Sequence, residues 1–293
     1  MRYRFVITFI FIVLPVLSGT LVFSDEALSA SKQALAAAKV KTAPAGPDDS
    51  AWGKAKAIQV PFEGKENFSG KKTSVITKAV YTNNDIYFLE INRINNFATK
   101  GCAVVCHVPA GATNAKEGKF GTATAAEKGD LWHWKAARSD PAGFADDTYL
   151  TKIGDKKGGR KSDAGKGGDK KNMTADKSKP MYMPASGNLL GKHGILLAAQ
   201  SAEISDYSVF KTGDTLTYRL PKMPKGSRGD IKAVSSYGNG GWSVMLYRKL
   251  DTGHDDDVAF NPRKKYNFAM ALFDDSGDED SYDSEVITLQ FKR

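Results

Sequence analysis

Residues 74–92 contain two stretches that decide the fold: Ser74–Thr82 (SVITKAVYT) and Asp85–Asn92 (DIYFLEIN). Both are rich in β-branched and aromatic residues, which favour the pleated surface of a strand. Asn83 and Asn84 lie between them, and a short polar pair of this kind is typical of the turn that joins two antiparallel strands. The pattern therefore predicts a β-hairpin here.

Further strands are expected along the rest of the chain. No long stretch has the 3.6-residue periodicity of an amphipathic helix. Many short strands separated by Gly, Asp and Lys indicate a mostly β protein, an antiparallel β-sandwich with loop insertions and few short helices. The expected strands are Leu131–Ala136, Gly194–Ala199, Thr215–Leu220, Trp242–Leu250, Tyr266–Phe273 and Glu285–Phe291.

Length and composition bound the class of protein. The chain has 293 residues, of which 41% are hydrophobic and 26% are charged, and it has two cysteines. These values exclude a collagen, a coiled coil, a wholly disordered chain and a small fold stapled by disulfides. We expect residues 51–293 to form one domain, because a chain of this length can bury its own core.

The N-terminus has the pattern of an export signal. Arg2 and Arg4 precede the uncharged stretch Phe5–Phe23, whose apolar part is shorter than the roughly 20 residues that span a bilayer. Small residues suit cleavage after Ser24. We therefore expect residues 1–24 to be a signal peptide and the mature protein to be periplasmic or extracellular. An uncleaved N-terminal anchor is the alternative.

Two other segments lack a core pattern. Residues 25–50 are expected to be a flexible lead-in, with a possible short helix over Ala27–Val40. Thr151–Lys179 holds nine Lys and Arg160 against four Asp, with six Gly and no aromatic residue. A solvated, flexible insertion is one interpretation, and a basic docking surface for an acidic partner is the other. Nucleic acid is not expected, because aromatic residues do not alternate with these lysines.

The C-terminal part is acidic. It contains Asp255, Asp256 and Asp257 in a row, and then seven acidic residues from Asp274 to Glu285. The stretch DDSGDED suggests calcium, but it lacks the spacing of an EF-hand loop. We therefore expect acidic turns here.

Residues 101–107 read GCAVVCH and hold both cysteines of the chain. The sequence C-x-x-C-H attaches haem, and here one residue more lies between the cysteines. Two thiols can add to the two vinyl groups of one porphyrin, and the adjacent histidine can bind the iron. The motif predicts one covalent haem c, attached through Cys102 and Cys106 and ligated by His107.

Other interpretations of this motif are weaker on physical grounds. A disulfide between Cys102 and Cys106 would close a very small loop and would leave His107 unexplained. A zinc site needs four ligands, and no second cysteine pair is present. No Walker loop, dinucleotide fingerprint or nucleophile elbow occurs in the chain. A haem-free β-sandwich that binds another ligand remains open, with the two cysteines as a disulfide.

The motif and two further blocks resemble a known family. GCAVVCH, Lys128–Leu150 (KGDLWHWKAARSDPAGFADDTYL) and Gly240–Asp274 are similar to the cytochrome c-552/DMSO-reductase-like haem-binding family, which includes the haem subunit of ethylbenzene dehydrogenase. The resemblance extends over about residues 52–291 and implies a β-sandwich with one haem at its edge, with a role in electron transfer and no catalysis of its own.

The resemblance leaves two functions open. The subunits of molybdenum enzymes hold haem without a covalent bond, through Met and Lys, whereas the cysteine pair here resembles the c-type members. We therefore expect an exported monohaem c-type cytochrome with a redox partner protein that presents an acidic docking surface. The alternative is the haem subunit of a periplasmic molybdenum oxidoreductase complex.

The second axial ligand of the iron is expected from one of two residues. In DLWHWK, a strand would place Trp132 and Trp134 on one face and His133 on the other. Met183 precedes a proline in KPMYMP, as in the ligand loop of small cytochromes c. Minor candidates are Met181, Lys135, His193 and His254. If none binds, the iron keeps an open position.

Two more residues are candidate contacts of the haem. Arg138 can pair with a propionate, because a carboxylate out of water needs a charged partner. A salt bridge at the surface is the alternative for this arginine. Trp132 can pack against the porphyrin, whereas core packing is the alternative for this residue as for Trp134 and Trp242.

Overall fold

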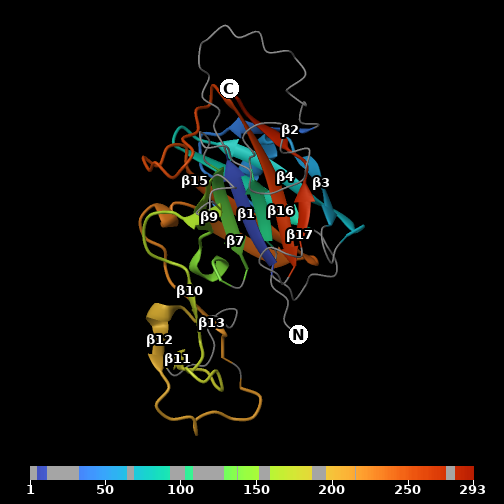
Figure 1. The fold of residues 1–293 in the computed structure, drawn as a ribbon. Coiled ribbons are helices and arrows are strands. Elements are labelled where there is room, and N and C mark those ends of the chain that lie inside the picture. The colour runs from blue at the N-terminus through green and yellow to red at the C-terminus, as the bar shows by residue number, and fades with distance from the viewer. Residues whose placement is uncertain are drawn as a thin grey trace.

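The computed structural model describes residues 5–11, 33–64, 69–92, 103–107, 129–136, 138–151, 159–186, 196–214, 216–274 and 281–293. These residues form one large curled sheet and a small lobe of two short hairpin-like sheets below it (Figure 1). The helical elements among them are short 3-10 helices: η1 (Ser50–Lys54), η3 (Asp140–Ala142), η5 (Ala198–Gln200) and η6 (Ser227–Gly229). None of the described helical segments has the length and apolar character needed to cross a bilayer.

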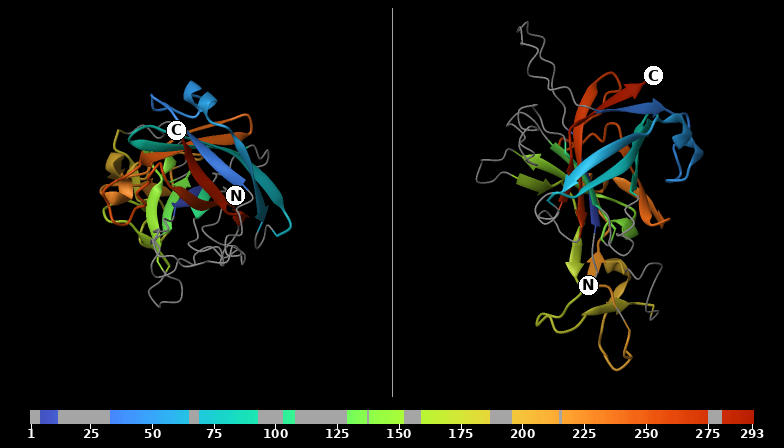
Figure 2. Two further views of the ribbon diagram at one scale, coloured as in Figure 1. Left: turned by 90° about the horizontal axis from the view of Figure 1, so that it is seen from above. Right: turned by 90° about the vertical axis from the view of Figure 1, so that its right-hand side faces the viewer.

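The large sheet has 14 strands. In spatial order it contains β14 (Lys232–Gly238), β15 (Gly241–Lys249), β5 (Asp85–Asn92), β4 (Lys72–Tyr81), β2 (Gln33–Lys39), β18 (Ile287–Lys292), β16 (Lys265–Asp274), β1 (Phe5–Phe11), β6 (Ala103–His107), β7 (Gly129–Lys135), β8 (Asp146–Thr151) and β9 (Gly159–Ser162). Two more strands, β3 (Ile58–Gly64) and β17 (Ser281–Ser284), connect β4 to β16. The sheet therefore curls until β4, β2, β18, β16, β17 and β3 form a closed ring, as the two views of Figure 2 show.

The predicted class is confirmed, with one difference in strand direction. The protein is mostly β and sandwich-like, but the sheet is mixed. Most neighbours are antiparallel, whereas β2 runs parallel to both β18 and β4, and β1 runs parallel to β6. A strand that enters the sheet from a distant part of the sequence is not bound to the antiparallel direction that a hairpin imposes.

The hairpin at residues 74–92 forms as predicted. β4 and β5 pair antiparallel, with Tyr81 opposite Ile86. The Thr82 hydroxyl accepts hydrogen bonds from the backbone N–H groups of Asn84 at 3.2 Å and Asp85 at 3.0 Å, so the turn closes on its own residues. Phe88 on β5 points into the main core.

The main core lies inside the curl of the sheet. It is lined by residues of β2, β3, β4, β5, β7, β14, β15, β16 and β18, and by loop residues between them. Trp132 packs edge-on against Phe88 at 5.7 Å, and Trp134 packs against Trp242 at 5.2 Å. A second, smaller cluster on the outer face of β4 and β5 packs under Trp52 of η1. The centre of the sheet is therefore buried on both faces.

The expected lead-in at residues 25–50 differs from the structure. Residues 33–39 form β2, which is hydrogen-bonded between β18 and β4, with Leu35 and Ala37 fully buried. Alanine favours helices in isolation, but tertiary contacts override so weak a preference. The possible helix over Ala27–Val40 is therefore wrong for residues 33–39, and the folded unit begins before residue 51.

The N-terminal stretch of the chain forms β1. Its residues pair antiparallel with β16 and β7. The stretch Phe5–Phe11 is apolar and β-branched enough to join a sheet. Export and cleavage after Ser24 remain predictions.

Two of the expected strands fall in the small lobe. One is shorter than expected, and the other does not form over its described residues. Gly194–Ala199 was expected as a strand, but Ala198–Gln200 forms η5, and residues 194–195 are outside the described part. Thr215–Leu220 contributes only its last residues to β13 (Arg219–Pro221). The lobe also contains β10 (Asp169–Lys171), β11 (Tyr182–Pro184) and β12 (Ser201–Glu203).

The basic insertion Thr151–Lys179 is more ordered than the expected loop, over the residues described. It contributes β9 to the large sheet, and β10 pairs with β13 in the lobe. A Cβ atom on Gly165, whose φ is +133°, would lie 1.9 Å from the carbonyl oxygen of Lys225. This glycine therefore permits a close approach of two backbones, and it is not merely a source of flexibility.

Candidate functional site

Strands β6 and β7 bring the two most specific sequence blocks together. Val105 on β6 lies opposite His133 on β7, and on its other side β6 pairs with β16, with His107 opposite Ala269. The backbone of Cys106 and His107 therefore lies one strand away from the DLWHWK block. Cys102 lies outside the described residues.

The predicted alternation of side chains on β7 is present. Trp132 and Trp134 are fully buried in the main core. His133 points to the other face, where it is 3% exposed and its ring lies 6.2 Å from that of Phe273 on β16. The structure thus places a buried imidazole on the strand next to the motif, and it places Trp132 in the core.

Lys135, a minor candidate ligand, is already engaged. Lys135 is 6% exposed, and its ammonium forms a buried ion pair with Asp146. Arg228 lies 3.6 Å from the same carboxylate. A lysine held in this way is not available to an iron atom unless the pair breaks.

Met183 lies in a different part of the molecule. It is on β11, opposite Ala202 of β12, in the small lobe below the large sheet (Figures 1 and 2). The buried Asn172 side chain fixes this segment: its oxygen accepts from the N–H groups of Met181 and Tyr182, and its nitrogen donates to the carbonyl of Tyr182. The structure does not bring Met183 beside β6.

The other two minor candidates are also not at β6. His193 is outside the described residues. His254 lies on the loop after β15, where its Nδ1 atom is 2.6 Å from Asp230. The hydrogen bond with Asp230 raises the pKa of His254. This imidazole is therefore better suited to an ion pair than to an iron.

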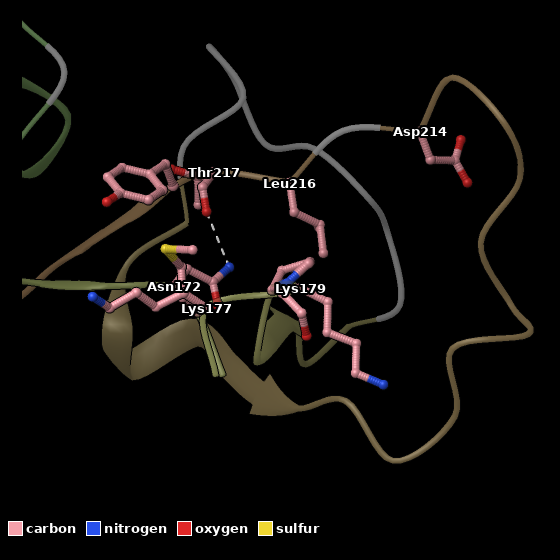
Figure 3. Close-up of a pocket in the computed structure, with 10 residues that line it drawn as sticks. Asn172, Lys177, Lys179, Asp214, Leu216 and Thr217 are labelled. Atoms are coloured by element: carbon pink, nitrogen blue, oxygen red, sulfur yellow. Dashed lines mark hydrogen bonds between the residues drawn. The ribbon is translucent and has the colours of Figure 1, made fainter. Parts of the chain in front are cut away.

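The lobe contains a pocket of about 390 Å³ (Figure 3). It is lined by residues of the basic insertion, including Lys177 and Lys179, and by the segment that contains Asp214 and Leu216. The Asn172 amide donates to the carbonyl of Thr217 at 3.0 Å along one wall. None of the candidate haem residues lines this pocket.

Arg138 has a carboxylate partner from the protein itself. Its Nη1 atom lies 3.8 Å from Asp169 of β10, and Arg219 of β13 approaches the same carboxylate at 2.7 Å. The arginine side chain is 25% exposed. The salt bridge that the sequence left as an alternative is thus present, and it connects the large sheet to the lobe.

A buried charge cluster was not predicted from the sequence. Arg248 on β15 has no exposed side-chain surface, and it pairs with Asp130 of β7 at 2.7 Å and Asp257 at 2.8 Å. It also donates to the carbonyl of Val258 at 2.5 Å. The guanidinium lies 5.2 Å from the ring centre of Trp132, which adds a cation–π contact.

Two more carboxylates border this cluster. Asp147 on β8 is fully buried, and Asp163 follows β9 and is 4% exposed. Burial raises the pKa of Asp147 well above its usual range and raises that of Asp163 to about 7. The three-residue acidic run at 255–257 is therefore only partly the solvated turn that we expected, since Asp257 belongs to the interior.

The residues at β6 and β7 suit a haem by their donor chemistry. A thiol and an imidazole stand at adjacent positions, Cys106 and His107, and a second imidazole, that of His133, is buried on the next strand. Thiol and imidazole are the groups that attach and ligate haem in c-type proteins. Cys106, His107 and His133 are the described residues that would hold the group.

Comparison with known families connects these observations. The family model for ethylbenzene dehydrogenase matches residues 89–285, which is more than half of the chain. The match includes the cysteine motif, β7 and the charge cluster. No curated protein matches the chain significantly.

Proposed function

Because the chain belongs to the ethylbenzene dehydrogenase family, we propose that it is an exported electron-transfer protein, a monohaem c-type cytochrome with haem attached through Cys102 and Cys106. The observation that carries this proposal is the register of β6 against β7, which puts the C-H end of the motif beside a buried histidine. In this proposal His107 and His133 would hold the haem iron.

The haem would supply a one-electron couple, and the protein supplies ligation, burial and docking. His133 is held by a strand that is buried along its whole length, so its position is fixed by the sheet. Solvent exposure is one of the factors that set a haem potential, and β7 itself is buried. No other catalytic group is needed for electron transfer.

A second candidate function is supported by the family match. The resemblance to haem subunits of molybdenum enzymes favours a place in an oxidoreductase complex. The chain would then carry electrons within the complex. Purification of the tagged chain from its own host distinguishes the two: a stable molybdenum-containing partner supports the subunit, and isolation as a single coloured chain supports the free cytochrome.

Covalent attachment is tested with the full chain, produced in a host that matures c-type cytochromes. We expect sharp reduced absorption bands and haem that stays on the protein after acid–acetone extraction. Cys106→Ser should remove one thioether and shift the reduced band to the red, and Cys102→Ser together with Cys106→Ser should release all haem into the solvent. Extraction of all haem from the unaltered chain would contradict covalent attachment.

The axial ligands are tested with the same spectra. His107→Ala should abolish the low-spin spectrum. His133→Ala should convert the iron to a high-spin or ligand-accessible form, while Met183→Ala, the matched control, should leave the spectrum unchanged. A change with Met183→Ala and none with His133→Ala would assign the second ligand to the lobe.

The basic insertion predicts that electron exchange depends on salt. We expect the rate with an acidic redox partner to fall about tenfold or more between 0.01 M and 0.5 M ionic strength, because exposed charges are screened. Removing the charges of Lys161, Lys166 and Lys171, three exposed lysines of the insertion, should lower the rate at low salt. Removing the charges of Lys41, Lys54 and Lys56, three exposed lysines near η1, should leave that rate unchanged. A salt-independent rate would contradict electrostatic docking.

A further inference from the structure

The interior of the protein contains more acidic groups than basic ones at one place. Among the described residues, four carboxylates, those of Asp130, Asp147, Asp163 and Asp257, lie around one guanidinium, that of Arg248. All five side chains are buried or nearly so. Charges that are taken out of water need compensation close by, and one arginine balances only one of four ionised carboxylates.

Asp147 shows most directly that a partner is needed. It has no exposed surface, and neither of its carboxylate oxygens has a hydrogen-bond donor among the described residues. It offers an oxygen that lies within 4.8 Å of oxygens of Asp130 and Asp257. A fully buried carboxylate is thus directed into the cluster with no donor to receive it.

The neighbouring oxygens share this lack of donors. Both oxygens of Asp163 and Oδ1 of Asp130 also have no hydrogen-bond donor within the described structure. Asp163 lies within hydrogen-bond reach of Asp147, but two ionised carboxylates are both acceptors. Either shared protons or a cation must stand between them.

The loop that completes the cluster is held in place by other contacts. Asp256 accepts from the backbone N–H of Ala164 at 2.8 Å and from the hydroxyl of Ser227 at 2.6 Å. Thr252 donates to Asp257 at 2.5 Å. The carboxylates of β7, β8 and this loop are therefore positioned before any ion binds, which lowers the cost of forming a site.

We propose that Asp130, Asp147, Asp163 and Asp257 form a binding site for one calcium ion. Calcium takes six to eight oxygen ligands in irregular geometry, whereas magnesium demands an octahedron and keeps several waters, and zinc and copper favour nitrogen and sulfur. The donors here are oxygens from four separate parts of the chain. The ion connects β7, β8, the residue that follows β9 and the loop after β15, so its role is to stabilise the fold.

The first test measures calcium binding by the full chain after treatment with chelator. Calcium at about one hundred times its dissociation constant should raise the midpoint of thermal unfolding by about 5–10 °C. Terbium is the second probe, because Trp132 lies close enough to sensitise its luminescence, and calcium should displace it while magnesium at the same concentration should not. The absence of both a thermal shift and terbium luminescence at millimolar concentrations would overturn the proposal.

The matched variants are Asp147→Asn and Asp255→Asn. Asp255 lies two positions from Asp257 in the same acidic run, but it is exposed. Asp147→Asn should abolish at least nine tenths of the calcium-dependent shift, and Asp255→Asn should keep it. Full retention of the shift by Asp147→Asn would place the ion elsewhere and overturn the assignment. If Asp147→Asn does not fold, terbium binding by Asp163→Asn gives the same decision.

Discussion

Replacing Arg248 by methionine should destabilise the protein by about 3–5 kcal/mol at pH 7, which is a large part of the stability of a typical domain. The side chain of Arg248 has no exposed surface, and it is the cation of the buried cluster. Methionine fills similar space but leaves Asp130 and Asp257 as carboxylates without a partner. The cost comes from those stranded charges more than from lost packing.

The measurement is urea unfolding of both chains in the presence of chelator. Arg219→Met is the control, because Arg219 also pairs with an aspartate at 2.7 Å but is 24% exposed. A partly exposed pair of this kind contributes about 0–1 kcal/mol. Each variant removes an arginine–aspartate pair of 2.7 Å, and the two pairs differ in burial. Equal losses for Arg248→Met and Arg219→Met would contradict the burial argument.

The loss in Arg248→Met should also depend on pH. Burial raises the pKa of Asp130, and the attraction of Arg248 lowers it. Removal of the arginine therefore raises this pKa further, so Asp130 takes up a proton more readily in the folded state. As the pH falls, the carboxylates left without a partner become neutral. The difference in the free energy of unfolding between Arg248→Met and the unaltered chain should therefore shrink.

The parts of the fold that were predictable are those encoded over short distances. β5 was predicted with its observed bounds, and β4, β15 and β16 were each predicted within two residues at either end. In each, β-branched and aromatic residues alternate between faces, and a local turn or glycine marks the end. These signals need no knowledge of the rest of the chain.

The parts that were not predictable depend on distant partners. The sequence of β2, QALAAAK, favours a helix, and it becomes a strand because β18 and β4 offer hydrogen bonds on both sides. The glycines of the basic insertion suggested flexibility, but Gly165 is needed where two backbones touch. Neither partner can be read from the local sequence.

The candidate site was predicted in part. The cysteine motif and His133 were identified from their neighbours in sequence, but only the register of β6 and β7 shows that His133, and not Met183, lies beside the motif. The charge cluster was missed, although a signal existed. Val244, Leu246 and Arg248 alternate on one face of β15, so a strand pattern already places this arginine toward the core.

The same signal marks a second buried ionisable residue, Glu90. It follows Ile86 and Phe88 on the core face of β5 and is 1% exposed. The Thr77 hydroxyl lies 2.5 Å from its carboxylate and 3.8 Å from the sulfur of Met270. Burial raises the pKa of Glu90 well above its usual range, against a smaller lowering by the hydrogen bond with Thr77. The carboxyl therefore keeps its proton in the folded protein at a pH where the unfolded chain has lost it.

Glu90→Gln should consequently make the protein less sensitive to alkaline pH. The folded state of the unaltered chain binds the Glu90 proton more tightly than the unfolded state, so its stability is complete below the ordinary glutamate pKa. Above that value the stability falls by about 1.4 kcal/mol for each pH unit, until the folded form ionises as well. Glutamine has the same shape and no charge at any pH, so the variant lacks this slope.

Urea unfolding at several pH values between 4 and 8 gives the free energy of unfolding of both chains. The difference between the two values cancels the contributions of all other groups. Near pH 4 the two should be nearly equal, and Glu90→Gln should gain steadily as the pH rises. Glu63→Gln is the control, because Glu63 is exposed and forms only a surface pair with Lys72 at 3.5 Å. Parallel curves for Glu90→Gln and the unaltered chain would mean that Glu90 is ionised in the folded protein. Its charge would then have to be balanced within the core by a group other than Thr77, because a neutral hydroxyl cannot offset the desolvation of a carboxylate.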